Sequence, residues 1–417
     1  MVCAIDATYA YFPYALSGGD KMEKVVAYEK AKKLIAESTP TLSHEVVTLE
    51  KALNRVTAEE VHSPTDIPET ATSAMDGYAL RVQDIQKVPA RLKIVAEVLA
   101  GEKKRISLSP GESCYVATGA ALPDNADTVI KVEDAKVEGD WLVVDRKPEK
   151  GQFVNPQGSE LQKGKVVVPK GEKIDFRIAG LLARVGAYQV KVFLKPKIAV
   201  IATGKEIKEP FEEGGIKNTN AYILKGLLKE YADISYMGII DDSLPSIKEA
   251  IKEASKHHHI VITTGGVSVG KADFVKKALS ELGWQIRFEF TNIKPGRPLT
   301  FATLSDTLFF GLPGYPSAML VNALEFLMPA VRKLQGFSRV DNSYIEVIAA
   351  ENFKSRKGKV YFVRANFEFR DGKVFAYSAG SQLTSNYFTS AVCQGFVIIP
   401  EEKESLAKGE VAKALML

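Results

Sequence analysis

The sequence predicts a multidomain protein that combines α/β and β domains around a central, open and mostly parallel α/β sheet. Two observations lead to this fold class. Between Lys197 and Gly336, short apolar runs alternate with amphipathic helical patterns. Before and after this region, short β-rich runs are separated by turn residues. A chain of 417 residues has room for about three domains.

The composition argues against several classes of protein. The net charge of +4 is small for 417 residues, and Lys and Glu are interspersed, so the concentrated basic surface of a nucleic-acid-binding protein is not expected. The longest apolar stretch, Phe309–Val331, is interrupted by Pro313 and Glu325, which argues against a membrane span. The three cysteines are far apart and match no zinc or redox spacing. We therefore expect a reduced, cytoplasmic protein without nucleic-acid or membrane partners.

The first 186 residues are predicted to contain a few helices and many short strands. Apolar residues recur at helical spacing from Lys24 to Glu37, and a second short helix is expected from Leu49 to Val56. An amphipathic helix is expected at Phe176–Arg184. The strands expected here cover residues 92–98, 113–118, 128–132, 141–145 and 165–169, with a hairpin turn at Glu138-Gly139-Asp140.

The region after Lys197 is predicted to alternate strands and helices. Strands are expected at residues 197–203, 234–240, 259–264 and 307–312, and helices at residues 222–231, 246–256, 274–282 and 317–334. Ser246 and Glu249 have the spacing of a capping box, which predicts that one helix begins at Ser246. After Gly336 the strands expected are residues 344–349, 359–369, 374–378 and 396–400, with an Asp371-Gly372 turn.

These patterns predict four domains and an N-terminal extension. Residues 22–62 and 147–186 are assigned to a connecting domain, and residues 63–146 to a small β domain. Residues 187–337 are assigned to the α/β domain and residues 338–417 to a C-terminal, barrel-like β domain. We expect residues 1–21 to be either a disordered tail or the result of an upstream start codon, with Met22 as the true initiator.

The most prominent motif is the glycine-rich segment Thr264–Gly270, which follows a buried strand and precedes Asp273. Glycines after a strand allow the backbone amides to converge on an anion, and a helix N-terminus adds favourable polarity. The hydroxyl groups of Thr264 and Ser268 could donate to a phosphate. A tight turn in which Asp273 only caps the helix explains the same pattern, and the motif alone does not decide between them.

Three other strand ends carry similar residues. Thr203-Gly204 is followed by Glu206, Asp242 follows another strand, and Gly311–Pro316 opens the last helix of the region. Ligands of such sheets bind at the carboxyl ends of the strands. Three carboxylates at strand ends, those of Glu206, Asp242 and Asp273, therefore favour a shared site for a divalent cation, although each alone would be explained as a cap.

Two further segments carry polar residues in turns. Lys294–Pro298 holds two cations close together between prolines, as an oxyanion such as molybdate or phosphate requires, although a solvated basic turn is the simpler interpretation in isolation. In the small β domain, Thr72–Ala79 surrounds Asp76 with apolar side chains, and Val116–Ala120 is a run of small residues around Thr118.

Taken in order, these segments resemble the motifs of the molybdopterin molybdenumtransferases, a family that includes the bacterial MoeA proteins and the E domain of gephyrin. The resemblance extends from about Met22 to the C-terminus, and the ordered combination is far more specific than any single motif. The matching segments are Ser73–Ala79, Ala117–Ala120, Thr264–Gly270, Ile293–Gly296 and Gly311–Gly314.

The resemblance implies an elongated four-domain subunit whose α/β domain is of the molybdopterin-binding type. It implies a homodimer in which the small β domain of one subunit completes the active-site cleft of the other. The implied activity is that of a molybdopterin molybdotransferase, which inserts molybdate or tungstate into adenylylated molybdopterin with Mg²⁺-dependent release of AMP. A molybdopterin adenylyltransferase is the implied partner in the pathway.

The resemblance also implies roles for individual residues. The catalytic residues would be Asp76, Thr118, Glu206, Asp242 and Asp273, and the last three would hold the metal. Binding of the pterin and its phosphates would fall to Thr203, Gly204, Thr264, Gly265, Gly266, Ser268, Pro313 and Gly314. The oxyanion would be bound by Lys294, Arg297 and Arg364. A serine of the last domain is also expected, but an insertion near Ser385–Ser390 leaves its position open.

The sequence departs from the family pattern at three places. Lys205 stands where the family usually has Asp, which changes the charge beside Glu206. Tyr315 replaces the usual Asn between Gly314 and Pro316. The run Asn155–Glu160 lacks the arginines that the family often carries there, so an arginine contact from this run is not expected.

Two other functions are compatible with parts of the sequence. A molybdopterin adenylyltransferase or a nucleotide pyrophosphatase would share the α/β domain, but such proteins resemble only the segment Lys197–Gly336. A scaffold protein like the E domain of gephyrin, which also binds receptor peptides, would not need the acidic and basic positions that this chain retains.

Overall fold

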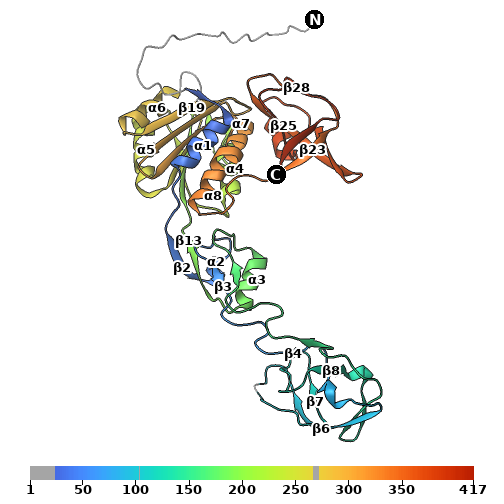
Figure 1. Cartoon of the computed structure of the whole chain (residues 1–417). Helices are drawn as coiled ribbons and strands as arrows, with labels where there is room; N and C mark the ends of the chain where they lie inside the picture. Colours follow the sequence, from blue (N-terminus) through green and yellow to red (C-terminus); the bar gives the residue numbers. More distant parts are fainter. Residues whose placement is uncertain (1–23, 103, 266–271) are drawn as a thin grey trace. The chain divides into compact units, whose positions relative to one another are not determined.

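The structure, a computed structural model, describes residues 24–102, 104–265 and 272–417, without the side chains of residues 272 and 273. These residues form two compact units (Figure 1). Residues 44–192 form the smaller unit, and residues 24–43 together with 193–417 form the larger one. Within the described residues, no helix is both long enough and apolar enough to cross a membrane.

The larger unit is built on a seven-stranded sheet with the order β1-β19-β21-β22-β18-β14-β17. Its strands β22, β18, β14 and β17 are parallel to one another, whereas β21 is antiparallel to both of its neighbours. This confirms the predicted open and mostly parallel sheet. The strands are β1 (Val25–Val26), β14 (Lys197–Thr203), β17 (Asp233–Ile240), β18 (Ile260–Thr264), β19 (Gln285–Thr291), β21 (Pro298–Leu304) and β22 (Thr307–Leu312).

Helices cover both faces of this sheet, and a separate apolar core lies under each layer (Figure 1). One layer contains α5 (Leu244–His257) and α6 (Ala272–Glu281), which pack on Val261 and Phe309. The other layer contains α1 (Tyr28–Ser38), α4 (Thr219–Leu228), α7 (Pro316–Asn322) and α8 (Met328–Leu334). Because both faces are covered, the central strands β14, β18 and β22 consist mostly of buried apolar residues, as the sequence pattern indicated.

The N-terminal segment differs from the predicted domain assignment. Residues 22–62 were expected to belong wholly to the connecting domain, but Val25 pairs with Phe290 at the edge of the seven-stranded sheet. The helix α1 then buries Ala31 and Ile35 in the same core as α4 and α8. Burial of this apolar face is what attaches the segment to the larger unit. The other predicted boundaries stay predictions.

Two helix predictions were wrong in detail. The helix expected to begin at Ser246 begins at Leu244, because the Ser243 side chain accepts from the Ser246 backbone N–H (3.4 Å) and Pro245 fits the first turn. The single helix expected at 317–334 contains a π-helical turn, Ala323–Leu327, between α7 and α8. Pro329 follows this turn and has no N–H to donate, which a wider turn accommodates.

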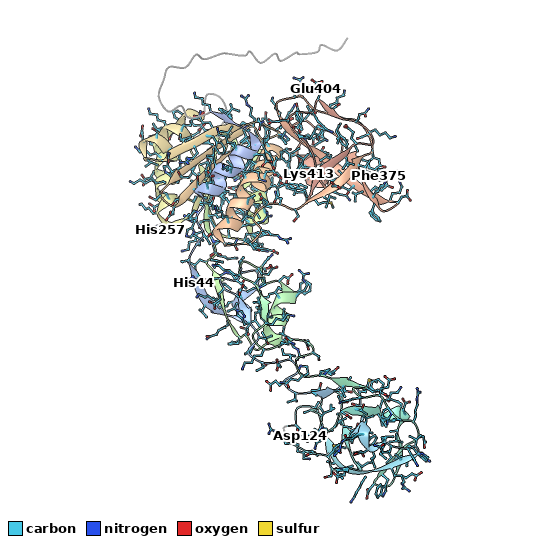
Figure 2. All side chains as sticks on the ribbon, viewed as in Figure 1. His44, Asp124, His257, Phe375, Glu404 and Lys413 are labelled. Atoms are coloured by element: carbon cyan, nitrogen blue, oxygen red, sulfur yellow. The ribbon has the colours of Figure 1, made fainter. Side chains whose placement is uncertain are left out.

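The C-terminal part of the larger unit is a closed barrel, as predicted. Strands β25, β26, β23, β29 and β27 pair in this order, and β27 pairs back with β25 (Figure 1). Phe375 and Lys413 mark two of these strands in Figure 2. The barrel strands are β23 (Tyr344–Ala349), β25 (Val360–Arg370), β26 (Lys373–Ser378), β27 (Gly395–Ile399) and β29 (Val411–Met416), accompanied by β24 (Phe353–Lys354), β28 (Ser405–Leu406) and α9 (Tyr387–Val392).

The smaller unit contains a six-stranded sheet with the order β8-β5-β7-β6-β10-β9. The predicted turn at Glu138–Asp140 joins β9 to β10 and is confirmed, with Gly139 at φ 60°. The strands are β5 (Gly77–Leu80), β6 (Ala90–Val98), β7 (Glu112–Val116), β8 (Thr128–Lys131), β9 (Lys136–Glu138) and β10 (Trp141–Val144), with the single turns Val82–Asp84 and Val132–Asp134.

The rest of the smaller unit consists of short strand pairs and two helices. The helix expected at 49–56 ends at Ala52, because Asn54 adopts φ 61° and Val56 already bridges to Lys173. The predicted helix at Phe176–Arg184 is confirmed as α3, which Asp175 caps. The elements are β2 (His44–Thr48), α2 (Leu49–Ala52), β3 (Val61–His62), β4 (Thr72–Ser73), β11 (Val154–Asn155), β12 (Val166–Val168) and β13 (Gln189–Phe193).

Candidate functional site

The predicted ligand-binding residues of the larger unit lie at one edge of the parallel sheet. In the register of β22, β18 and β14, Thr264 pairs with Leu312 on one side and with Ala202 on the other. Thr203 pairs in turn with Ile240 of β17. The carboxyl ends of four strands therefore form a single row, and the segments that follow them meet at the edge where ligands of such sheets bind.

The backbones of two loops approach each other closely at this edge. Gly265 has φ 89°, and its N–H donates to the Leu312 carbonyl oxygen (3.2 Å). A Cβ atom on Gly265 would lie 2.5 Å from the Thr203 carbonyl oxygen, and one on Gly314 would lie 3.6 Å from the Gly265 Cα atom. Only glycine fits at Gly265, both because of this contact and because of its positive φ. This contact holds the loops after β14, β18 and β22 close together at the edge of the sheet.

Two buried threonines lie at the same edge of the sheet. The side chains of Thr203 and Thr264 are 2% and 4% exposed, and the Thr203 hydroxyl donates to the Thr264 carbonyl oxygen (3.4 Å). Gly204, with φ 137°, continues from Thr203 into the turn that carries Glu206. The predicted residues Gly266 and Ser268 lie outside the described residues.

The acidic residues occupy the ends of neighbouring strands. Glu206 follows β14, and Asp242 follows β17, which pairs with β14. Lys205, which departs from the family pattern, lies 3.9 Å from the Asp241 carboxylate. This pair is exposed on both sides, and it places the extra positive charge beside Asp241, which follows β17.

The third predicted carboxylate is only partly placed. Asp273 lies in the first turn of α6, and the structure does not describe its side chain. Among the described residues, no group of three or more His, Cys, Asp or Glu side chains is arranged to hold a metal ion. The pair Glu206 and Asp242 supplies carboxylate oxygens, which are the ligands that Mg²⁺ prefers, and needs further donors to complete a site.

The predicted oxyanion-binding turn lies where the sheet meets the barrel. Strand β20 (Ile293–Lys294) pairs in parallel with β25, and the Lys294 ammonium lies 5.3 Å from the centre of the Tyr361 ring. The Arg297 guanidinium lies 5.5 Å from the Phe290 ring. A Cβ atom on Gly296 would lie 3.3 Å from the Ala318 carbonyl oxygen, so this turn packs against α7, which begins just after Gly314.

Two cations that the motifs did not identify join this turn. Burial, followed by the positive charges of Arg297 and Lys294, lowers the pKa of the Lys359 ammonium below its ordinary value. Arg356 acts on the same pKa in the same direction. Where side chains are described, Lys294, Arg297, Arg356 and Lys359 form no ion pair with a carboxylate. Like charges gathered without a counter-charge favour binding of an anion.

Sequence reasoning missed Lys359 and Arg356 because they belong to a turn without a motif. The only signal was the density of Lys and Arg in residues 354–359, which is common on solvated surfaces. The pairing of Lys294 with Tyr361 brings this turn alongside Lys294, and such pairing across domains cannot be read from spacing.

Arg364 has a different environment from the other predicted cations. Its side chain is 1% exposed, and its guanidinium donates to the carbonyl oxygens of Asn386 (2.8 Å) and Leu383 (3.1 Å). The Ser390 hydroxyl lies 3.4 Å from the guanidinium and donates to Ser317 of α7 (2.9 Å). Ser390 is therefore the serine of the inserted segment that stands closest to the predicted arginine, a position that the sequence had left open.

The predicted residues of the smaller unit form a direct contact. The Asp76 Oδ1 atom accepts from the backbone N–H (2.6 Å) and the hydroxyl (2.8 Å) of Thr118. These two bonds, the backbone one first, lower the pKa of the Asp76 carboxyl. A Cβ atom on Gly77 would lie 2.1 Å from the Ile130 carbonyl oxygen, so the Asp-Gly pair fixes the strand that positions Asp76. The sequence predicted both residues, and the structure brings them together.

Comparison with known families covers nearly the whole described chain. Residues 26–186 match the MoeA N-terminal region (domain I and II), residues 199–333 match a probable molybdopterin binding domain, and residues 346–417 match the MoeA C-terminal region (domain IV).

Individual proteins match over similar lengths. A molybdopterin molybdenumtransferase of Nostoc is 31% identical, covering 89% of this chain and 88% of that protein. The one of Haemophilus influenzae is 30% identical, covering 93% and 97%. A gephyrin of Dictyostelium discoideum is 28% identical over 93% of this chain and 62% of its own length. The crystal structure of a molybdopterin biosynthesis MoeA protein from Pyrococcus horikoshii OT3 superposes with a TM-score of 0.80 at 28% identity, covering 94% of this chain and all of that one.

Proposed function

This chain belongs to the molybdopterin molybdenumtransferase family, and from that premise we propose that it inserts molybdate or tungstate into adenylylated molybdopterin and releases AMP. One observation carries the proposal. The helix α7 begins directly after the Gly314 loop of the sheet edge, and the Lys294–Arg297 turn packs against the same helix. A site for phosphates and a site for an oxyanion are thereby held side by side.

The sheet edge suits the pyrophosphate of the substrate. The close glycine loops at Gly204, Gly265 and Gly314 let main-chain groups approach phosphate oxygens without intervening side chains. Thr203 and Thr264 add hydroxyl groups, and Pro313 holds the turn before α7. Together these groups would fix the phosphoanhydride so that an attacking oxygen and the leaving AMP oxygen lie in line.

We assign Glu206, Asp242 and Asp273 as the residues that would hold Mg²⁺. Carboxylate oxygens are the donors this ion prefers, and two of the three follow paired strands at the same edge. A bound Mg²⁺ would neutralise charge on the phosphoanhydride oxygens.

The oxyanion is assigned to the cationic turn. Lys294 and Arg297 would bind it, with Lys359 supplying a third positive charge from the turn that precedes β25. Molybdate and tungstate are tetrahedral dianions of similar shape, so charge alone does not separate them and both are included. We assign Arg364 to hold the segment Ser385–Ser390 against α7, and Ser390 of that segment would reach the oxyanion subsite.

We further propose a cytoplasmic homodimer in which the small β domain of one subunit completes the site of the other. The Asp76–Thr118 pair lies in an exposed loop of the smaller unit, and only one oxygen of its carboxylate receives the two bonds from Thr118. The other carboxylate oxygen could then face a substrate bound to the partner. A molybdopterin adenylyltransferase would supply that substrate.

The decisive experiment incubates the purified protein with adenylylated molybdopterin, Mg²⁺ and molybdate and measures AMP. We expect AMP release that depends on both ions, and a double variant, Lys294→Ala with Arg297→Ala, in which molybdate no longer stimulates AMP release. No AMP release by the wild-type protein under these conditions would refute the function. Unchanged molybdate dependence in the double variant would refute only the oxyanion assignment.

A further inference from the structure

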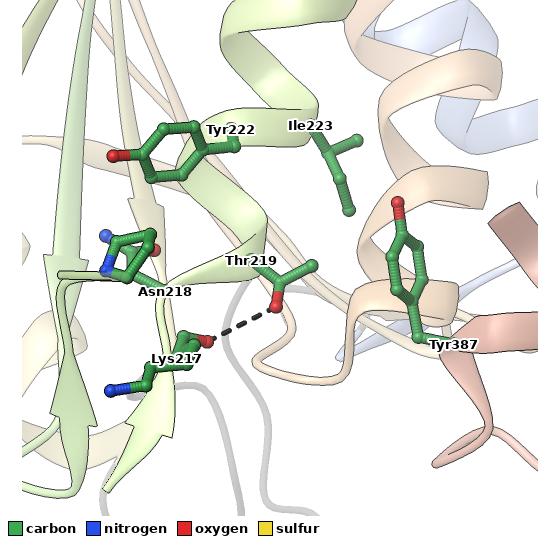
Figure 3. Close-up of a pocket in the computed structure, with 7 residues that line it drawn as sticks. Lys217, Asn218, Thr219, Tyr222, Ile223 and Tyr387 are labelled. Carbon is green, nitrogen blue, oxygen red and sulfur yellow. Dashed lines mark hydrogen bonds between the residues drawn. The ribbon is translucent and has the colours of Figure 1, made fainter. Parts of the chain in front are cut away.

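A cavity of about 390 Å³ lies beside the first turns of α4 in the larger unit. Its walls include Tyr222 and Ile223 of α4 and Tyr387, at the start of α9. Figure 3 shows the two tyrosine rings on opposite sides, with Thr219 and Ile223 between them. The cavity is therefore walled by aromatic and apolar groups and has a hydroxyl group at its floor. None of the roles assigned so far uses it.

The Tyr222 ring is linked to neighbouring side chains of the larger unit. The Lys225 ammonium lies 4.9 Å from the centre of the Tyr222 ring and 4.2 Å from that of Tyr236, so it is enclosed by two aromatic rings. The Tyr236 hydroxyl donates to Glu209 and accepts from Asn218 Nδ2 (2.6 Å). Since Asn218 also caps α4, this chain of contacts connects the half-exposed Tyr222 ring to the start of its own helix.

Both walls are attached to the loop that links the sheet edge to α7. On the α4 side, the Asn220 side chain donates to the carbonyl oxygens of Gly314 (3.0 Å) and Pro313 (3.3 Å). On the α9 side, the Ser317 hydroxyl donates to the Asn386 carbonyl oxygen (3.2 Å), one residue before Tyr387. The cavity therefore adjoins the loop at Gly314 to which we assign phosphate binding.

We infer that this cavity binds a planar nitrogen heterocycle of the substrate, with Tyr222 and Tyr387 stacking on the ring. The inference rests on the proposed function, because adenylylated molybdopterin carries a nitrogen heterocycle on each side of its pyrophosphate, namely adenine and a pterin whose pyrimidinone ring is planar. The cation behind Tyr222 withdraws electron density from that ring, which favours stacking with an electron-rich heterocycle. The Thr219 hydroxyl lines the cavity and donates to the Lys217 carbonyl oxygen (3.2 Å), so its oxygen can still accept a hydrogen bond from a ring N–H.

A phosphate is the less suitable occupant of the cavity. The Lys217 ammonium at its rim donates to the Glu212 carbonyl oxygen, and the Lys225 ammonium is enclosed by the two tyrosine rings. The phosphates belong instead at the adjoining glycine loops. Adenine and pterin share the chemistry that the cavity recognises, and the experiment distinguishes them.

The test measures binding of two probes by calorimetry, AMP for the adenine ring and 6-hydroxymethylpterin for the pterin ring. The variants are Tyr222→Ala and Tyr387→Ala, with Phe388→Ala as the matched control, because Phe388 follows Tyr387 on α9, is 75% exposed and does not line the cavity. Loss of stacking should weaken one of the probes about 10-fold, with the control unchanged. The probe that is weakened identifies the ring.

Two further variants test the inference if the alanine variants fail to fold. Thr219→Trp fills the cavity from a partly exposed position and should weaken the same probe, whereas Tyr387→Phe keeps the ring and should bind like the wild type. Unchanged affinity for both probes in the alanine and tryptophan variants, or an equal loss in Phe388→Ala, would overturn the inference. AMP release by the wild-type protein is assayed in parallel, so failure of the proposed function is seen separately.

Discussion

The contact between Asp76 and Thr118 stabilises the charged form of the Asp76 carboxyl, which is predicted to be catalytic. Both donors of Thr118 act on the same oxygen of Asp76, which stabilises the carboxylate form and lowers its pKa. Because the pKa is lower in the folded protein than in the unfolded chain, the stabilisation is present above the unfolded value of 3.8 and is lost as pH falls through the folded value.

Replacing Thr118 by Val should raise the pKa of Asp76 part of the way toward 3.8, because the hydroxyl is removed and the stronger backbone donor is kept. Carboxyl carbon chemical shifts followed by NMR as a function of pH measure this directly. Thr118→Ser retains the hydroxyl and should titrate like the wild type. If Thr118→Val titrates at the wild-type pH, the hydroxyl does not contribute to the charge state of Asp76.

Lys359 illustrates how a residue without a motif gains a role from its neighbours. It lies beside Lys294 and Arg297, which already lower its pKa, and where side chains are described it has no carboxylate partner. An anion that neutralises this cluster would favour the charged form of Lys359.

Lys359→Met should therefore raise the KM for molybdate about 10-fold, since a charge-assisted contact to a dianion is lost. AMP release at saturating molybdate should change little. Lys357→Met is the matched control, because Lys357 belongs to the same turn but pairs with Glu404 (3.5 Å). Equal effects of the two substitutions would show that only the general charge of the turn matters.

At the scale of elements, the π-helical turn between α7 and α8 joins three parts of the larger unit. Its Glu325 is 1% exposed and accepts hydrogen bonds from the hydroxyls of Tyr28 and Tyr344 (2.9 Å to the latter) and from Asn342 Nδ2 (3.2 Å). These residues come from α1, from β23 and from the segment before it. Burial raises the pKa of Glu325, and burial, followed by the charge of Glu325, raises the pKa of both tyrosines.

Glu325→Ala should lower the free energy of unfolding by about 2–4 kcal/mol, because it leaves two buried tyrosine hydroxyls without an acceptor. Denaturant unfolding near neutral pH measures this. Leu383→Ala, at a 69% exposed position, should have little effect. A loss below 1 kcal/mol for Glu325→Ala would mean that the network is not needed to join these elements.

The raised pKa of Glu325 predicts that the free energy of unfolding depends on pH. Its folded pKa lies above the ordinary value of 4.5, so the folded state binds its proton more tightly than the unfolded chain does. The resulting stabilisation is complete below pH 4.5 and is lost as pH rises through the folded pKa. Relative to the non-titrating Glu325→Gln variant, the wild type should therefore become less stable as pH is raised from 4. A constant difference across this range would contradict the raised pKa.

At the scale of the whole molecule, the residues assigned to one reaction are divided between two compact units. Asp76 and Thr118 belong to residues 44–192, whereas the sheet-edge loops and the cationic turn belong to the other unit. If a dimer assembles each site from the small β domain of one subunit and the sheet edge of the other, one subunit can compensate for a defect in its partner.

Mixing inactive Asp76→Ala protein with inactive Lys294→Ala protein, after dissociation and reassembly, should then restore roughly a quarter of the wild-type AMP release, because half of the dimers are mixed and each mixed dimer has one intact site. Each variant treated alone provides the control. No recovery, with mixed dimers demonstrated by differential tags, would contradict sites shared between subunits.

The strand ends and motifs could be predicted from the sequence because they depend on local physics. The spacing of apolar residues determines which segments become strands and which become helices. Position 265 requires glycine, because its φ is positive and the Thr203 carbonyl oxygen lies close. The sheet and the C-terminal barrel follow from these patterns, and Asp76 and Thr118 were each identified from a motif, although their contact was not predicted. The predicted start of α5 was wrong by a few residues, because Ser243 rather than Ser246 caps the helix.

What the tertiary structure decided is how distant segments meet. The pairing of β20 with β25 brings Lys359 and Arg356 to Lys294, and the segment 382–390 surrounds Arg364 and places Tyr387 opposite Tyr222. None of these contacts leaves a periodic signal, because each depends on side-chain packing between elements separated by tens or hundreds of residues. Sequence alone therefore determined the family, the fold class and the residues of the strand ends, and folding in three dimensions determined which charges and rings share a site.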